Sequence, residues 1–125
     1  MSRGARFADD VVEAVRRAKI VGVRAGTDHR YTGVWAVVVG GRVFVRSWND
    51  KPTGWFRAFR TEPGGTLQVG GLEIPVRARP ARGARVRDAV TAALGEKYDT
   101  PASRKWVAGF AEPARVRTTL EFVPG

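Results

Sequence analysis

The side chains best suited to chemistry lie in a polar segment at residues 46–55. Arg46, Ser47 and Lys51 offer a guanidinium fork, a hydroxyl and an ammonium group, which are groups that bind phosphate or another anion. Trp48 and Trp55 belong to the same segment and are able to flank a flat ring system. The segment therefore predicts either an anion site with aromatic walls or a solvated loop beside two core tryptophans.

A second group of candidates lies just upstream, in the polar stretch GTDHRYT at 26–32 and at the start of an apolar run. Arg30 and Thr32 are the groups of this stretch that suit a phosphate. Tyr31 and Trp35 are candidates for contact with a substrate, and the alternative for Trp35 is a place in the core. Residue types alone do not identify a catalytic residue, so the catalytic residue is unknown from the sequence.

Each of the remaining polar candidates has a surface or structural interpretation as well as a functional one. His29 could act as a proton donor or a haem ligand; the alternative is a surface histidine in an exposed loop. Asp88, Glu96 and Asp99 are possible general bases without a visible partner carboxylate. Five arginines at 77–87 suit a nucleic-acid backbone. However, no helix-turn-helix, zinc pattern or aromatic RNA platform accompanies them, so a solvated connection is favoured over a nucleic-acid partner.

Composition narrows the classes of function. The chain has 125 residues, which predicts one domain over 1–125 with residues 1–8 as a flexible tail. Zero cysteines and one histidine argue against thiolate zinc sites, thiol nucleophiles and His-rich metal centres, so we expect no metal. A net charge of +10 favours a small anionic molecule as partner. No apolar stretch is long enough to cross a membrane, and we expect a cytoplasmic protein.

The elements that must position these residues follow from periodicity and turn signals. Two Gly-Gly turns predict two β-hairpins, and Pro75 predicts an edge strand or a bulge. The fold class is α+β, a small antiparallel split β-barrel of about six strands with an N-terminal helix and two or three further helices. Helices are expected at 9–19, 55–60, 85–98 and from 101–103 onward. Strands are expected at 20–25, 33–39 (central and buried on both faces), 42–47, 66–69, 72–79 and 114–123 (a long closing strand).

The run RVFVRSWNDKPTGWFRAFRTEPGGTLQVGGLEIPVRAR resembles the core of the flavin-binding split barrels, namely pyridoxamine-phosphate-oxidase-like proteins and deazaflavin-dependent nitroreductases. The matching pieces are the strand Val43–Ser47, the polar loop Trp48–Gly54, the short helix Trp55–Pro63 and the hairpin Leu67–Ala78. The resemblance implies FMN or a deazaflavin as cofactor and places its binding groups at Arg30, Thr32, Arg46, Ser47, Trp48, Lys51 and Trp55, with Tyr31 and Trp35 toward the substrate.

A closer resemblance is to the bacterial family called domain of unknown function 2255, over roughly residues 7–124. The motifs that carry it lie at Phe7–Asp10, Phe44–Trp48, Trp55–Ala58, Glu96–Tyr98 and Pro113–Pro124.

Three functions are compatible with these features. The first is a homodimeric, nitroreductase-like small oxidoreductase that uses a flavin or deazaflavin on a small organic substrate, with the ligand near the subunit interface. The second keeps the fold without the flavin and binds or transforms a small anionic molecule in a specialised metabolic pathway. The loop GTDHRYTG, which is shorter than its counterpart in deazaflavin reductases, supports this second function. The third is a basic structural or nucleic-acid-associated protein.

Overall fold

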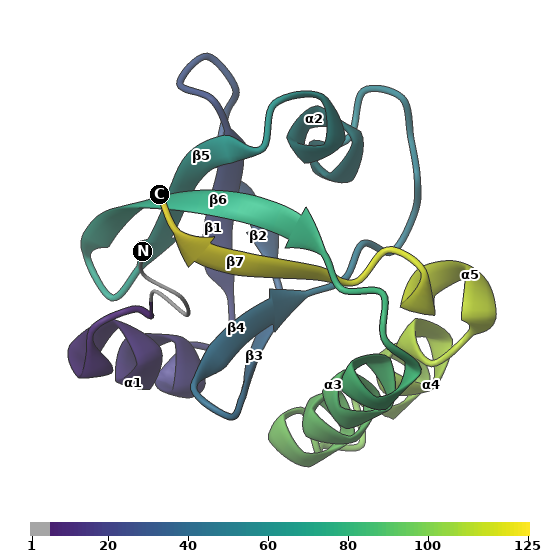
Figure 1. The fold of residues 1–125 in the computed structure, drawn as a ribbon. Coiled ribbons are helices and arrows are strands. Elements are labelled where there is room, and N and C mark those ends of the chain that lie inside the picture. Colours follow the sequence, from purple (N-terminus) through teal and green to yellow (C-terminus); the bar gives the residue numbers. More distant parts are fainter. Residues whose placement is uncertain (1–5) are drawn as a thin grey trace.

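The computed structural model describes residues 6–125 and has an α+β architecture in which a nearly closed antiparallel barrel carries helices at both ends (Figure 1). The predicted tail falls in part on residues 1–5, outside the described residues, and Phe7 is buried against the core. The described chain forms, in order, α1 (Asp9–Arg17), β1 (Val21–Ala25), β2 (Thr32–Val34), β3 (Ala36–Val39), β4 (Arg42–Val45), α2 (Trp55–Thr61), β5 (Gly64–Val69), β6 (Leu72–Pro80), α3 (Ala84–Lys97), α4 (Arg104–Phe110), α5 (Pro113–Val116) and β7 (Leu120–Pro124).

The seven strands form one sheet in the order β2-β1-β5-β6-β7-β4-β3, and every neighbouring pair is antiparallel. The two outer strands, β2 and β3, are the two halves of a single stretch that is interrupted at Trp35. The prediction of one central strand at 33–39 is therefore wrong. Val34 pairs with β1 while Ala36 pairs with β4, so this stretch leaves one ladder and joins another, and the barrel stays open at the break.

Both predicted Gly-Gly turns are confirmed. Gly40 and Gly41 have φ angles of 58° and 78°, and Gly70 and Gly71 have 56° and 79°. Positive φ at both central residues is the geometry of a two-residue hairpin whose twist matches that of its strands, and glycine adopts it without a steric penalty. The turns fix the registers of β3 with β4 and of β5 with β6.

Two predictions for the second half of the chain are wrong. Residues 114–123 do not form one strand, because Pro113 occupies the first turn of helix α5 and strand β7 begins only at Leu120. Proline is well suited to that helical position, since it lacks the N–H that would be unpaired there. Pro75 does not mark an edge strand, because β6 lies between β5 and β7. The N–H of Gly125 donates to the carbonyl oxygen of Pro75 at 3.0 Å, so the missing N–H of Pro75 lies at the end of the β6–β7 ladder, beyond the last registered pair at Val76.

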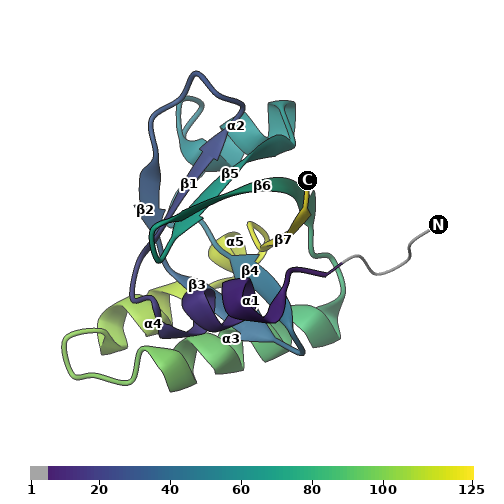
Figure 2. The same cartoon turned by 90° about the vertical axis from the view of Figure 1, so that its left-hand side faces the viewer.

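The core has two parts that lie on opposite faces of the sheet. One fills the barrel, where Val43 and Val45 of β4 are buried. The other lies under α3, where Phe44 of the same strand packs with Val90 and Leu94. The alternation of a strand thus directs neighbouring residues into separate clusters. In Figures 1 and 2, α2 lies at one end of the barrel, and α3 and α4 lie at the other.

Two polar anchors hold the elements together. The carboxylate of Glu121 on β7 is buried and accepts hydrogen bonds from Arg42 of β4 at 2.8 Å and from Arg79 of β6 at 3.1 Å. These bonds hold the pKa of Glu121 below its usual value although burial acts to raise it. The Nζ of Lys97, in the last turn of α3, donates to the carbonyl oxygens of Val15 and Ala36 at 2.8 and 2.6 Å, and so ties α3 to α1 and β3.

Within residues 6–125, none of the helices combines the length and the apolar character that crossing a membrane would require.

Candidate functional site

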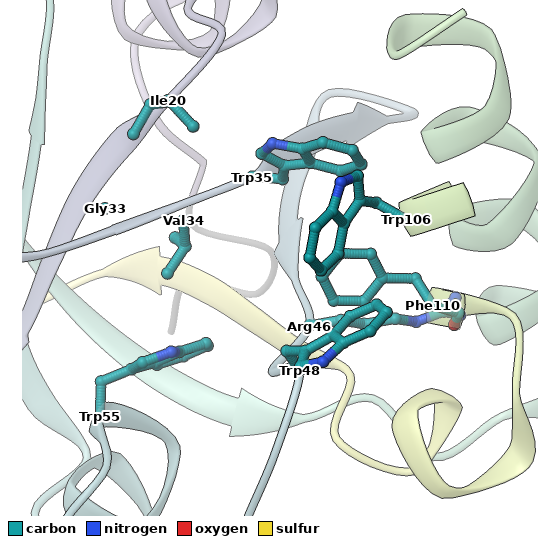
Figure 3. Close-up of a pocket in the computed structure, with 9 residues that line it drawn as sticks. All are labelled: Ile20, Gly33, Val34, Trp35, Arg46, Trp48, Trp55, Trp106 and Phe110. Carbon is teal, nitrogen blue, oxygen red and sulfur yellow. Dashed lines mark hydrogen bonds between the residues drawn. The ribbon is translucent and has the colours of Figure 1, made fainter. Parts of the chain in front are cut away.

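A cavity of about 330 Å³ opens where the barrel is interrupted, beside Trp35. Its wall is dominated by aromatic side chains, and it includes all four tryptophans of the chain. Figure 3 shows Trp55 and Trp48 on opposite sides of an open space, with Trp35, Trp106 and Phe110 completing the aromatic wall. We call this space the aromatic cavity; its lining residues are Ile20, Gly33, Val34, Trp35, Arg46, Trp48, Trp55, Trp106 and Phe110.

The four tryptophans reach the aromatic cavity from four different places in the fold. Trp35 lies at the break between β2 and β3, Trp48 follows β4, Trp55 is the first residue of α2, and Trp106 belongs to α4. None of the four is fully buried, and Trp106 is 43% exposed. The fully buried core is made of other residues, against which Trp55 and Trp35 pack, so these tryptophans form the boundary between the core and the cavity.

Two of the tryptophans that line the aromatic cavity are held in place by contacts with neighbouring side chains. The ring of Trp35 stacks on Tyr98 with centroids 3.8 Å apart and planes within 6°. Tyr98 donates a hydrogen bond from its hydroxyl to the carbonyl oxygen of Lys19 at 2.8 Å, and its burial raises its pKa to about 12. The guanidinium carbon of Arg115 lies 3.5 Å from the ring centroid of Trp48. This spacing is a close cation–π contact, so both rings hold fixed orientations.

Arg46 brings a buried positive charge to the cavity wall. The residue is 3% exposed and donates four hydrogen bonds, all to neutral oxygens. The acceptors are Oγ1 of Thr119 (2.8 Å), Oγ1 of Thr91 (2.8 Å), the carbonyl oxygen of Phe110 (3.1 Å) and that of Arg87 (2.7 Å). Burial, with a smaller effect from the charge of Arg87, lowers the pKa of Arg46 to about 10. Among the described residues no carboxylate pairs with it, so the wall carries a net positive charge.

A second, smaller cavity of about 190 Å³ shares Trp55 with the aromatic cavity. Its wall is polar and basic, with contributions from β1, the β1–β2 loop, β2 and the start of α2. We call it the polar cavity; its lining residues are Arg24, Ala25, His29, Arg30, Thr32, Thr53, Gly54, Trp55 and Ala58.

The structure brings some of the predicted site residues together and leaves others apart. Arg46, Trp48, Trp55 and Trp35 line the aromatic cavity, and the polar cavity takes in Arg30 and Thr32.

Three predicted residues lie outside both cavities. Ser47 is buried and its hydroxyl donates to the carbonyl oxygen of Asn49. Lys51 is exposed. Tyr31 lies under the guanidinium of Arg24, 4.5 Å from the ring centroid, and donates to Glu73 at 3.2 Å.

Sequence reasoning missed four contributors. Trp106 and Phe110 of α4, Arg24 of β1 and Thr53 are not among the predicted site residues. The spacing of Trp106 and Phe110, one helical turn apart, was the available signal, since residues at i and i+4 share a face. Within the described residues, no group of acidic and histidine side chains is arranged to hold a metal ion.

Fold and site together define a class: a small antiparallel barrel with a ligand-sized, tryptophan-lined cavity at its opening. The family profile described as uncharacterized protein conserved in bacteria, domain of unknown function 2255, matches residues 10–122, and the chain belongs to this family. A comparison with curated proteins finds no match. Among solved structures, the conserved hypothetical protein Rv2991 from Mycobacterium tuberculosis is similar, with a TM-score of 0.56 and 13% identity over 98% of this chain and 82% of that one. At this identity the likeness concerns the fold alone.

Proposed function

We propose that the protein binds a planar heteroaromatic ligand of the flavin or deazaflavin type in the aromatic cavity and acts as a small oxidoreductase on a small organic substrate. The observation that carries the proposal is that all four tryptophans line this one cavity while none is fully buried. Indole rings that keep a free face offer stacking surface to a flat ligand. The cavity of about 330 Å³ lies within the range of small-molecule sites.

The chain's own contribution in this proposal is binding and orientation. A flavin, when bound, supplies the hydride or electron chemistry itself. Trp55 and Trp48 line opposite sides of the cavity, as in Figure 3, and would both contact the ring. Arg46 supplies a fixed positive charge at the wall. That charge favours a ligand that is anionic or becomes more electron-rich on reduction, since an opposing charge stabilises it in a partly desolvated site.

Retention of a chromophore tests the proposal. The purified protein is scanned from about 300 to 500 nm before and after addition of FMN or a deazaflavin and removal of the excess, and tryptophan emission is titrated in parallel. Retained absorbance bands and quenching of the emission are expected. Trp55→Leu and Trp48→Leu should each weaken binding by roughly 2- to 12-fold, the value of one aromatic stacking contact. Leu72→Ala, which removes an exposed apolar side chain that lines neither cavity, serves as the control and should leave affinity unchanged.

Absence of both retention and quenching would refute the flavin proposal. The aromatic cavity would then be assigned to a colourless small anion bound without a redox cofactor, and Arg46 would be its main determinant.

We also propose that the protein forms the homodimer predicted from its sequence. Ile20 and Trp106 line the aromatic cavity and are 52% and 43% exposed, and burial of such apolar surface by a second copy would stabilise a dimer. Size-exclusion chromatography with light scattering measures the mass directly, and a monomer at all concentrations would contradict the prediction.

A further inference from the structure

The polar cavity concentrates basic and hydroxyl side chains from segments that are separate in sequence. Arg24 comes from β1, His29 and Arg30 from the β1–β2 loop, Thr32 from β2, and Thr53 from the loop before α2. Two guanidinium groups, an imidazole and two hydroxyls thus surround one space of about 190 Å³. These are the donor types that recognise phosphate oxygens.

No carboxylate lines the polar cavity within the part of the chain that the structure describes. Over the same residues, neither Arg24 nor Arg30 forms an ion pair. The acid Glu62 lines, together with Arg57, an adjoining hollow that shares His29, Thr53, Gly54 and Ala58 with the polar cavity. The positive charge of the polar cavity is therefore not neutralised by its own wall, which favours an anion inside it.

Arg24 is held in place while one of its donors has no acceptor. Its guanidinium lies over the ring of Tyr31, 4.5 Å from the centroid, and Tyr31 is in turn fixed by its hydrogen bond to Glu73. The Nε of Arg24 is buried and has no hydrogen-bond partner. The buried Nε is out of reach of a bound anion, so an anion in the polar cavity would accept from the terminal N–H groups of this guanidinium, whose charge no carboxylate of the described residues neutralises.

We propose that the polar cavity binds the terminal phosphate group of the ligand whose ring occupies the aromatic cavity. Trp55 belongs to both walls, so a ligand with a ring and a phosphate joined by a flexible chain would pass this side chain and fill both spaces. The inference rests on the proposed function for the ring. It adds that the phosphate is recognised by Arg24, Arg30 and Thr53, and not by the loop residues Ser47 and Lys51.

The test compares FMN with riboflavin, which share the ring and differ in the phosphate. Dissociation constants are measured by quenching of tryptophan emission, and inorganic pyrophosphate is titrated separately by calorimetry. FMN should bind roughly 10- to 100-fold more tightly than riboflavin, the value of one charge-assisted hydrogen bond. The preference should shrink as salt is added, because exposed parts of the site are screened. Pyrophosphate should bind the ligand-free protein and compete with FMN more than with riboflavin.

Three variants assign the effect to the polar cavity. Arg24→Gln should abolish the preference for FMN while leaving riboflavin affinity unchanged. Arg30→Gln and Thr53→Val change exposed positions, so they keep the test decisive if Arg24→Gln does not fold, and each should reduce the preference. Arg60→Gln is the matched control, since it removes an exposed arginine that lines neither cavity.

The outcomes separate the two proposals. Equal affinity for FMN and riboflavin, with normal quenching by both, would overturn the phosphate site and leave the ring site standing. Binding of pyrophosphate without binding of either flavin would overturn the ring site, and loss of pyrophosphate binding in Arg24→Gln would then support the anion site alone. A preference for FMN that survives in all three variants would also overturn this assignment.

Discussion

Gly109 is the position where a single methyl group most directly tests the architecture of the aromatic cavity. A Cβ added there would lie 2.6 Å from Cζ3 of Trp48 and closer still to Cη2. Carbon atoms in favourable contact are about 3.5–4.0 Å apart, so Gly109→Ala requires a shift of about 1 Å. Trp48 cannot move freely, because Arg115 lies against its face and donates to its carbonyl oxygen at 2.7 Å.

Two effects of opposite sign decide the stability of Gly109→Ala. Overpacking of a tight contact costs about 1–3 kcal/mol, and replacement of glycine by alanine in a helix gains at most about 1 kcal/mol. We therefore expect the variant to be less stable by about 1–2 kcal/mol. Gly95→Ala is the matched control in helix α3, because its Cβ would meet Val107 at an ordinary 3.9 Å. That variant should be more stable by about 0.5–1 kcal/mol.

Thermal unfolding followed by far-ultraviolet circular dichroism measures both variants. For a chain of this length 1 kcal/mol corresponds to roughly 4 °C in Tm, so the two variants should differ in sign and by well over the error of the measurement. Gly109→Ala should also weaken binding of FMN, since Trp48 would leave its position. A Tm for Gly109→Ala equal to or above that of the parent protein would refute the placement of Trp48 against α4.

Three further predictions concern the rest of the fold. Burial lowers the pKa of Lys97 to about 8 from 10.5, so the folded state binds fewer protons than the unfolded state in this range. The free energy of unfolding should then rise from pH 8 to 10. In Lys97→Met, the free energy of unfolding measured by urea denaturation should depend less on pH over this range. Glu121→Gln should cost about 1–3 kcal/mol at neutral pH. Because the folded pKa of Glu121 is lowered from 4.5, the difference from the parent should begin to shrink below pH 4.5 and be lost only as the pH falls through the folded pKa; a pH-independent difference would contradict the ion-pair role. Gly65→Ala would place a Cβ against the carbonyl oxygen of Arg24 and 2.8 Å from Cε1 of Phe59, so circular dichroism should show a largely unfolded protein, whereas Gly83→Ala, with open space around it, should fold normally.

Local signals in the sequence located most of the elements because those elements depend on neighbouring residues. The Gly-Gly turns and the first helix are examples, since hairpin geometry and helical periodicity are set within a few positions. The break at Trp35 could not be predicted in this way. Val34 and Ala36 pair with different strands, and the apolar run around them looks the same whether or not the chain changes partner.

The types of side chain at the candidate site could be predicted from the sequence, but only some of the residues that line it could. Aromatic and basic residue types at 46–55 indicated a ring and an anion, and Trp48 and Trp55 do line one cavity from opposite sides. Arg24 could not be separated from the other arginines, because its role depends on the pairing of β1 with β5 and on the ring of Tyr31. Ser47 has a suitable hydroxyl, but the backbone oxygen of Asn49 uses it, which only the folded loop reveals.

The late position of β7 has a consequence during synthesis of the chain. Strand β4 is complete at Val45, yet one of its two partners is β7, which begins at Leu120. Until the ribosome has delivered β7, the nascent chain exposes the unpaired edges of β4 and β6. Unpaired edges recruit other chains, so crowding of ribosomes on one message should promote aggregation of this protein more than that of a barrel whose neighbouring strands are consecutive.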